Sequence, residues 1–258
     1  MTQFTGRTFV PEHLDDPDVD PEILARSLRF IRMVNARLGG TSAALGHVRR
    51  WTRSWPRQRP LRVLDVGTGT ADIPLALLRW GRRSGFDVRV TAVDNHAQTL
   101  EFARRHLREA GEGGADGRIA LVDLDARRLM DRFAPEDFDI VHAGMFLHHL
   151  PDVEIVTMLR IMDRLAACGL IWNDLSRDPL SAVAVRLLTL GLPALVRHDA
   201  VVSVAKGFRR GEALDLARRA GIAGATFHRH LCGRFTLTVL RADGSGRSSG
   251  SGACSSAP

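Results

Sequence analysis

The stretch that decides the fold is "VLDVGTGTADIPLAL", residues 63–77. An apolar run carrying Asp65 is followed by a turn with two glycines and then by a segment with helical spacing. The turn begins like the dinucleotide motif G-x-G-x-x-G, but Asp72 stands where packing on a pyrophosphate needs Gly or Ala. A P-loop needs a lysine after its last glycine, and the only lysine is Lys206. The turn therefore indicates backbone that approaches a ligand closely, and Asp65 favours a cationic one.

Length and composition favour one large α/β domain. The chain has 258 residues and 45% hydrophobic content, enough for a sizeable core. Cys168, Cys232 and Cys254 are few, odd in number and widely spaced, so they predict neither a disulfide framework nor a metal site, and they fit a reducing cytoplasm. The N-terminus lacks the apolar core of a secretory signal. The most apolar segment, residues 180–196, is interrupted by Arg, Gly and Pro and is too short to span a membrane.

The positive charge comes almost wholly from arginine. The formal net charge is +7, and a single lysine is present among 36 Lys and Arg. Such a bias fits codon composition as well as an anionic partner. The one local concentration, "RRWTRSWPRQRPLR" at residues 49–62, interleaves arginines with Trp51 and Trp55 as a nucleic-acid surface does. We favour a solvated helix end that leads into the first strand.

From residue 61 onward, strand patterns alternate with helical patterns. Strands are predicted over 61–66, 88–94, 119–122, 138–143 and 169–175, with helices ending near 80 and spanning 97–110, 153–166 and 212–220. This alternation implies right-handed crossovers and a parallel sheet. The last two apolar segments, "ATFHRH" and "RFTLTVLRA", are expected to form an antiparallel closing pair.

Three regions are predicted along the chain. Residues 1–58 form a lead-in and a helical cap, with helices over 21–38 and 42–52. Residues 59–242 form the main domain, and an apolar insertion at 178–208 forms a helical lid, a piece of plain core or a dimer contact. The tail, residues 243–258, is Gly/Ser-rich and predicted to be disordered.

Acidic residues follow three successive predicted strands. Asp65 lies at the end of the first, Asp94 ends the second, and Asp123 and Asp125 follow the third, while residues 142–144 end the fourth. A lone acid at a strand end is usually a turn former. In an open parallel sheet, however, the carboxyl ends of the strands share one edge, where ligands bind. The acids therefore predict a ligand site at that edge.

This constellation resembles the class I S-adenosylmethionine-dependent methyltransferases. The segments "VLDVGTGTAD", "VTAVDNH", "LVDLDARRL" and "FDIVHAGMFLHHLPD" look like four successive motifs of that family, and the resemblance covers residues 61–242. It implies an α/β, Rossmann-like fold with a mostly parallel seven-stranded sheet and helices on both faces. It also implies S-adenosylmethionine as the cofactor.

The resemblance assigns cofactor roles to individual residues. Asp65 and the turn hold the methionine end, Asp94 accepts from the ribose hydroxyls, and Asp125 accepts from the adenine amino group. The full set is Asp65, Gly67, Thr68, Gly69, Thr70, Asp94, Asn95, Asp125, Ala126 and Ala143. Thr70 departs from many members, which carry a third glycine there. Asn35 either reaches the methionine carboxylate or caps a helix end.

The form "LHHLPD" is similar to that of methyltransferases of ubiquinone and menaquinone synthesis. The segments "VNARLGG" and "NDLSRDP" resemble a bacterial group encoded beside type III polyketide synthases. We therefore predict a cytoplasmic enzyme that methylates a small aromatic, phenolic or quinonoid, or polyketide-like metabolite, at oxygen more than at carbon, with a homodimer as one arrangement. An RNA methyltransferase and a non-catalytic cofactor-binding scaffold remain alternatives.

Alignment of the reactants outweighs acid–base chemistry in methyl transfer. Positioning supplies roughly 7–11 kcal/mol, whereas a placed base adds on the order of 10²–10⁴ in rate. The candidate bases are His148 and His149, of which only one is expected to face the site; packing under the loop is the alternative. Asn173, Arg197 and His198 are candidate contacts for polar groups of the acceptor. The apolar insertion predicts an apolar, ring-bearing acceptor.

Overall fold

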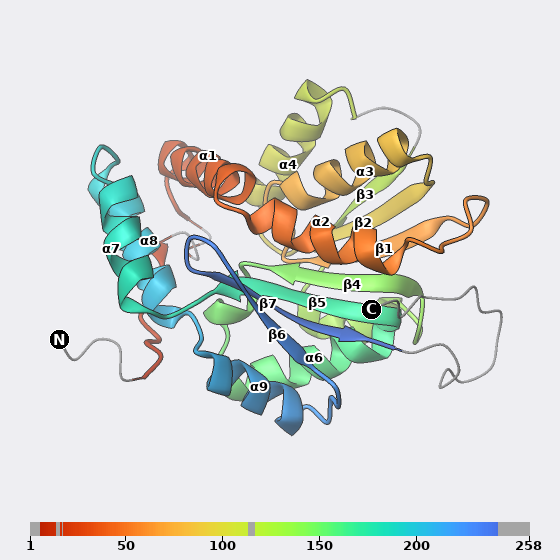
Figure 1. The fold of residues 1–258 in the computed structure, drawn as a ribbon. Coiled ribbons are helices and arrows are strands. Elements are labelled where there is room, and N and C mark those ends of the chain that lie inside the picture. The colour runs from red at the N-terminus through yellow and green to blue at the C-terminus, as the bar shows by residue number, and fades with distance from the viewer. Residues whose placement is uncertain (1–5, 14–15, 17, 113–116, 242–258) are drawn as a thin grey trace.

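One mixed sheet organises the computed structural model, which describes residues 6–13, 16, 18–112 and 117–241 (Figure 1). Within these residues the sheet has seven strands in the order β3-β2-β1-β4-β5-β7-β6. The strands are β1 (Leu61–Val66), β2 (Val88–Asp94), β3 (Ile119–Asp123), β4 (Phe138–Gly144), β5 (Ala166–Leu175), β6 (Thr226–His230) and β7 (Arg234–Leu240). The first five run parallel and β6 and β7 form an antiparallel pair, as the sequence predicted; β7 is also antiparallel to β5. The predicted disordered tail lies outside the described residues.

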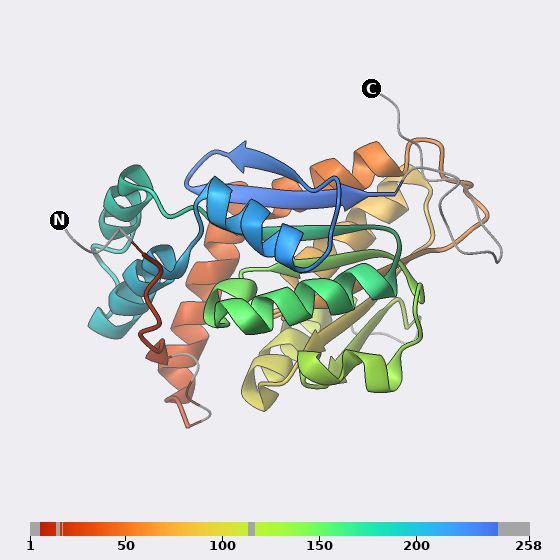
Figure 2. The same cartoon turned by 90° about the horizontal axis from the view of Figure 1, so that it is seen from below.

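Helices cover both faces of the sheet. One face carries α2 (Gly40–Trp51), α3 (Asp72–Ser84) and α4 (Ala97–Glu109). The other carries α5 (Leu129–Arg132), α6 (Asp152–Leu165) and α9 (Arg210–Arg219), and Figure 2 shows α6 and α9 lying side by side across it. Strand β5 begins three residues earlier than predicted because α6 ends at Leu165 and runs directly into it.

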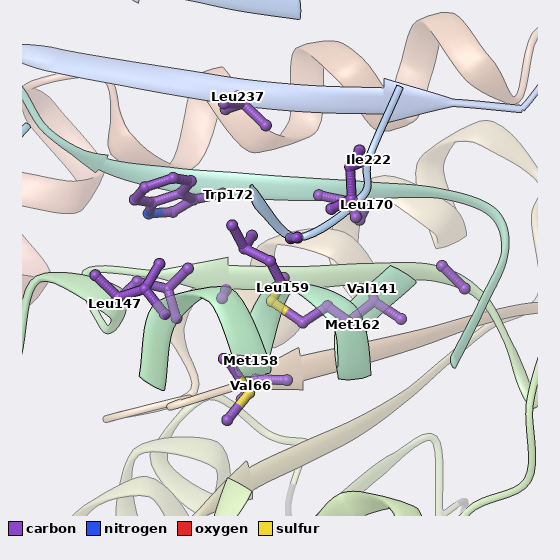
Figure 3. Close-up of a cluster of buried hydrophobic side chains, with 14 of the residues drawn as sticks. Val66, Val141, Leu147, Met158, Leu159, Met162, Leu170, Trp172, Ile222 and Leu237 are labelled. Carbon is purple, nitrogen blue, oxygen red and sulfur yellow. The ribbon is translucent and has the colours of Figure 1, made fainter. Parts of the chain in front are cut away.

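The largest apolar cluster lies between the sheet and the α6 face. Figure 3 shows Trp172 and Leu170 of β5 and Val141 of β4 facing Leu159 and Met162 of α6. All five side chains are fully buried. The central strands are buried on both faces, which is why they read as near-continuous apolar runs in the sequence. This packing fixes the strand ends that carry the candidate site.

The N-terminal cap begins with α1 (Pro21–Arg37). Asp20 starts this helix, because its carboxylate accepts hydrogen bonds from the backbone N–H groups of Glu22 and Ile23, and Pro21 occupies the first turn. The buried side of α1 contains Leu24 and Leu28. The helix lies beyond the carboxyl ends of the strands, close to the insertion (Figure 1).

The insertion is helical, as predicted, and forms a pair of helices. They are α7 (Pro179–Leu188) and α8 (Ala194–Lys206), and the break falls where Gly191 and Pro193 interrupt the apolar segment. Figure 1 shows the pair at the end of the sheet beside α1. Helix α7 leaves several large apolar side chains exposed, namely Leu180, Val183, Leu187 and Leu188. Among the described residues, no helix is both long and apolar enough to cross a membrane.

Candidate active site

A cavity of about 490 Å³ lies at the carboxyl edge of the sheet. It is next to the boundary between β1 and β4, where the strand order reverses. Its floor is formed by the glycine turn and by the ends of β2, β3 and β4, and its roof by α1, α7, α8 and the lead-in. The volume falls in the ordinary range for small-molecule sites.

The glycine turn holds its shape through backbone geometry and one carboxylate. Gly67 and Gly69 have φ values of +66° and +57°, which L side chains rarely adopt. A Cβ on Gly67 would lie 2.7 Å from Cγ of Phe146, so the close approach of that ring requires glycine. Asp94 Oδ2 accepts a hydrogen bond from the Gly69 N–H at 2.9 Å, which ties the turn to the end of β2.

Asp65 lies beneath the turn rather than in the cavity wall. Its two carboxylate oxygens bond the Thr68 hydroxyl and Nδ1 of His142, each at 2.6 Å. The residue is 3% exposed and does not line the cavity. Ala143 is buried in β4 and does not line the cavity either. Asp65 is therefore placed to hold the turn and to act on a ligand only through its charge.

The other predicted cofactor residues all line the cavity, from the glycine turn to Asn95, Asp125 and Ala126. Asp94 Oδ1 accepts from the backbone N–H of His96 at 3.0 Å. Burial raises the pKa of Asp94, and the hydrogen bonds from His96 and Gly69 offset this only in part. A buried carboxylate of this kind is stabilised by further hydrogen-bond donors.

His148 is held in the cavity wall by a buried carboxylate. It belongs to the short turn η3 (Leu147–His149), and its Nδ1 lies 2.7 Å from Asp174 Oδ1. Burial favours a higher pKa for Asp174, but the charge and hydrogen bond of His148, with bonds from Trp172 and Leu175, hold that pKa below its ordinary value. The His148 Nε2 atom is buried without a hydrogen-bond partner among the described residues.

His149 also lines the cavity, contrary to the expectation that only one of the two histidines would face it. The tight turn stacks the two rings with centroids 4.2 Å apart. Glu12 Oε1, from the lead-in, lies 3.8 Å from Nε2 of His148 and 3.8 Å from Nδ1 of His149. The ammonium of Lys206 is 3.1 Å from the same oxygen. Because Lys206 already supplies a cation to Glu12, the cluster fits proton chemistry better than divalent metal binding, although its three ligating atoms lie within 4.8 Å of one another.

Three predicted acceptor contacts lie outside the cavity wall. Asn173 is buried in β5, where its amide nitrogen donates to the Gly40 carbonyl at 2.9 Å and anchors α2 to the sheet. Arg197 and His198 are exposed on α8. Nδ1 of His198 lies 3.2 Å from Oδ1 of the buried Asp199. None of the three touches the candidate site directly.

The sequence analysis did not single out Arg7, Glu12 or Asp174. Arg7 pairs with Asp152 at 2.5 Å and donates to the His148 carbonyl at 3.1 Å, so the lead-in fixes the histidine turn. Asp174 had one available signal, an acid next to Asn173 near the end of the otherwise apolar β5 sequence. Arg7 and Glu12 had none, because an arginine and an acid in a polar lead-in are ordinary surface residues.

The basic stretch at residues 49–62 lies away from the cavity. It precedes β1, so it lies at the amino edge of the parallel strands, opposite the carboxyl edge. Trp51 and Trp55 are buried, and Arg59 pairs with Asp139 at 2.6 Å. The two indoles are therefore core side chains and not an exposed stacking platform.

The strand order, the glycine turn and the acids at successive strand ends are the features that the resemblance to class I methyltransferases predicted. Residues 63–169 match a family model described as a methyltransferase domain. The matched segment runs from β1 into β5. No curated protein matches the chain.

Solved structures of low sequence identity share the fold. A Nostoc punctiforme protein provisionally described as an O-methyltransferase is 18% identical with a TM-score of 0.57; the match covers 83% of this chain and 60% of that protein's length. The plantazolicin methyltransferase BamL is 14% identical with a TM-score of 0.58, covering 80% of this chain and 70% of BamL. The magnesium protoporphyrin IX methyltransferase of Synechocystis is 16% identical with a TM-score of 0.53, covering 79% and 84%.

Proposed function

We propose that this protein transfers a methyl group from S-adenosylmethionine to a hydroxyl of a small aromatic, phenolic or quinonoid, or polyketide-like metabolite. The observation that carries this proposal is His148, which Asp174 orients in the wall of the same cavity that contains the glycine turn and Asp94. The proposal takes residues 59–242 as the catalytic domain and residues 1–58 as its cap.

The floor of the cavity fits the cofactor. Asp94 already accepts two backbone hydrogen bonds and is partly buried, so the two hydroxyls of a ribose would supply donors for its remaining lone pairs. Asn95 lines the wall beside it, and Asp125 with Ala126 lies where an adenine amino group would be received. The backbone of residues 67–70 receives the methionine end. When bound, the cofactor supplies an electrophilic methyl group on a sulfonium.

His148 is the proposed general base. Asp174 accepts from Nδ1–H, which leaves Nε2 as the lone-pair nitrogen of a ring that lines the cavity. Nε2 would take the proton of an acceptor hydroxyl as its oxygen displaced S-adenosylhomocysteine from the methyl carbon. The resulting imidazolium is balanced by Asp174 and by Glu12, 3.8 Å from Nε2. An acceptor attacking through oxygen makes use of this base directly.

The roof supports an apolar acceptor. It presents Leu24 and Leu28 of α1, Val185 and Leu188 of α7, and Val196 and Val204 of α8. These side chains exclude water and hold a flat ring against the methyl group, which is the larger contribution to the rate. Two of the similar structures above are named for compounds, plantazolicin and magnesium protoporphyrin IX, which supports a small-molecule acceptor.

The two alternatives have less support. An RNA methyltransferase would use the basic stretch at residues 49–62, but this lies at the opposite edge of the sheet. A non-catalytic scaffold would not need an oriented histidine beside an apolar acceptor space. We also propose a cytoplasmic location, and we propose the exposed apolar side of α7 as a dimer contact.

Methyl-labelled cofactor tests the proposal when it is incubated with a panel of phenols, quinols and total RNA. Label is expected in a phenol or quinol. His148→Ala is expected to lower the single-turnover rate at least 10-fold with unchanged affinity for S-adenosylhomocysteine, and His149→Ala serves as the neighbouring control. Label in RNA would favour the nucleic-acid alternative. Tight cofactor binding without any turnover would favour the non-catalytic scaffold. A fall in the single-turnover rate of less than about threefold in both variants would contradict a histidine general base.

A further inference from the structure

Arg234 is a buried cation that forms no ion pair within the described part of the chain. It is the first residue of β7, it is 1% exposed, and it lines the cavity. Its Nη2 donates to Asn35 Oδ1 at 2.5 Å, while its Nε is buried without a hydrogen-bond partner. A guanidinium presents a planar set of donors, and most of that capacity is unused here. A buried charge without an ion pair destabilises the fold unless a ligand accepts its unused hydrogen bonds.

The nearby carboxylates do not form an ion pair with Arg234. Asp72 and Asp174 stabilise its charge from beyond ion-pair distance. Asp174 is occupied by His148, and Asp72 accepts from the Asn35 amide at 2.9 Å and from the Thr70 hydroxyl at 3.2 Å. The Asn35 amide therefore stands between the arginine and Asp72. The guanidinium remains available to an anion in the cavity.

The backbone is shaped around this guanidinium. Strand β7 is antiparallel to β5 and pairs Arg234 with Leu175, so its first residue lies at the edge where the parallel strands end. A Cβ on Gly40 would lie 3.0 Å from both Cζ and Nη1 of Arg234, and 2.7 Å from Asn35 Oδ1. The start of α2 thus needs a glycine to admit the arginine and its amide partner. Both features hold Arg234 in the wall.

We propose that Arg234 binds a carboxylate of a molecule held in the cavity. The planar fork of arginine matches a carboxylate through two parallel hydrogen bonds. Two sources share this chemistry: the α-carboxylate at the methionine end of the cofactor, and a carboxyl group on the acceptor. The series Arg234, Asn35, Asp72 and Thr70 leads to the glycine turn, which favours the cofactor. The inference rests on the proposed function above.

The test compares ligands with and without a carboxylate by calorimetry. Wild type, Arg234→Met and Arg234→Lys are titrated with S-adenosylhomocysteine and with 5′-methylthioadenosine, which lacks the amino-acid end. If the cofactor is the source, Arg234→Met weakens S-adenosylhomocysteine binding at least 30-fold and 5′-methylthioadenosine binding less than threefold. Arg234→Lys keeps the charge but not the fork, and its loss is intermediate. Arg229→Met, an exposed arginine on β6, is the matched control and leaves both affinities unchanged.

A second arm tests the acceptor as the source. 4-Hydroxybenzoate and its methyl ester are titrated with S-adenosylhomocysteine at saturation. A preference for the acid in wild type that Arg234→Met abolishes, with unchanged S-adenosylhomocysteine affinity, assigns the carboxylate to the acceptor. If Arg234→Met does not fold, Arg234→Lys takes its place in both arms. Unchanged affinities in both arms overturn the inference, whereas a wild type that binds neither nucleoside overturns the proposed function instead.

Discussion

The floor and the roof of the cavity are built in different ways. The floor comes from strand ends of a parallel sheet, and its acids, such as Asp94 and Asp125, follow consecutive strands. The roof joins segments that are far apart in the chain, as when Glu12 of the lead-in meets His148 and Lys206. The sheet therefore determines the proposed cofactor half of the cavity, whereas the proposed acceptor half depends on tertiary contacts of the lead-in, α1 and the insertion.

The largest effect is expected at the floor, from Asp94→Asn. The amide keeps the shape but loses the charge that receives the ribose hydroxyls, so S-adenosylhomocysteine affinity should fall about 100-fold. The unfolding midpoint of the free protein should stay the same or rise, because burial already raises the pKa of this carboxyl. Titration calorimetry measures the first quantity and urea unfolding the second. Unchanged affinity would show that Asp94 does not receive the cofactor.

Gly67→Ala tests the junction of floor and roof. Left-handed strain and the contact with the Phe146 ring should together cost about 2 kcal/mol of unfolding free energy. Gly69→Ala is the matched control, because its φ is similar but nothing lies within 4 Å of the added Cβ, so the expected loss is about 1 kcal/mol. Urea unfolding measures both. Equal losses of unfolding free energy in the two variants would mean that the Phe146 ring moves aside without cost.

Asp174→Asn tests the roof. An amide at this position can donate to Nδ1 and leave the proton on Nε2, where the ring can no longer accept one. The single-turnover rate should fall about 10–30-fold while S-adenosylhomocysteine affinity stays within twofold. Trp172→Phe removes only one of the three donors to Asp174 and is expected to have less than a threefold effect on the rate. A fall in affinity without a fall in rate would contradict the positioning role.

The smallest effect concerns the docking of α2 against the closing strands. Burial, together with His228, Arg50 and His230, lowers the pKa of His47 to about 4. The unfolded chain takes up this proton near pH 6.5, so stability is lost as the pH falls below that value toward 4. The free energy of unfolding should fall by about 1 kcal/mol between pH 7 and pH 5.5 from this group.

Urea unfolding across that pH range checks the His47 prediction. His47→Gln can retain a hydrogen bond to Thr236, the present partner of the ring at 2.8 Å, without titrating. The variant should therefore show a shallower pH dependence than wild type. The pKa values of His228 and His230 are also lowered, so both residues likewise reduce stability as the pH falls. Both residues are present in wild type and in the variant. Identical slopes would exclude a contribution from His47.

The sequence predicted the floor well because its geometry follows from periodicity. Once strands end at Asp94 and near Asp125, a parallel sheet must bring both to one edge. Asp65 satisfied the same rule, yet Thr68 and His142 take up its oxygens beneath the turn. Which atom a carboxylate bonds depends on neighbours from other strands, and spacing does not contain that information.

The roof could be predicted only in outline. The apolar insertion indicated a lid, but no local pattern shows that Arg7 and Glu12 fold back onto the histidine turn. Arg234 was hidden for the same reason, since one arginine among many carries no signal until antiparallel pairing places it. Sequence separation thus limited what could be inferred about the acceptor half.

The antiparallel pairing of β7 also has a consequence for biosynthesis. Within the described residues, strand β6 pairs only with β7, and β7 joins the sheet at β5, so neither β6 nor β7 can dock before residues 226–240 have been synthesised. The arginine in the wall arrives with that last strand. A nascent chain still lacking β7 has the proposed cofactor-binding floor but an incomplete cavity wall, so ligand binding should begin only after β7 has been synthesised.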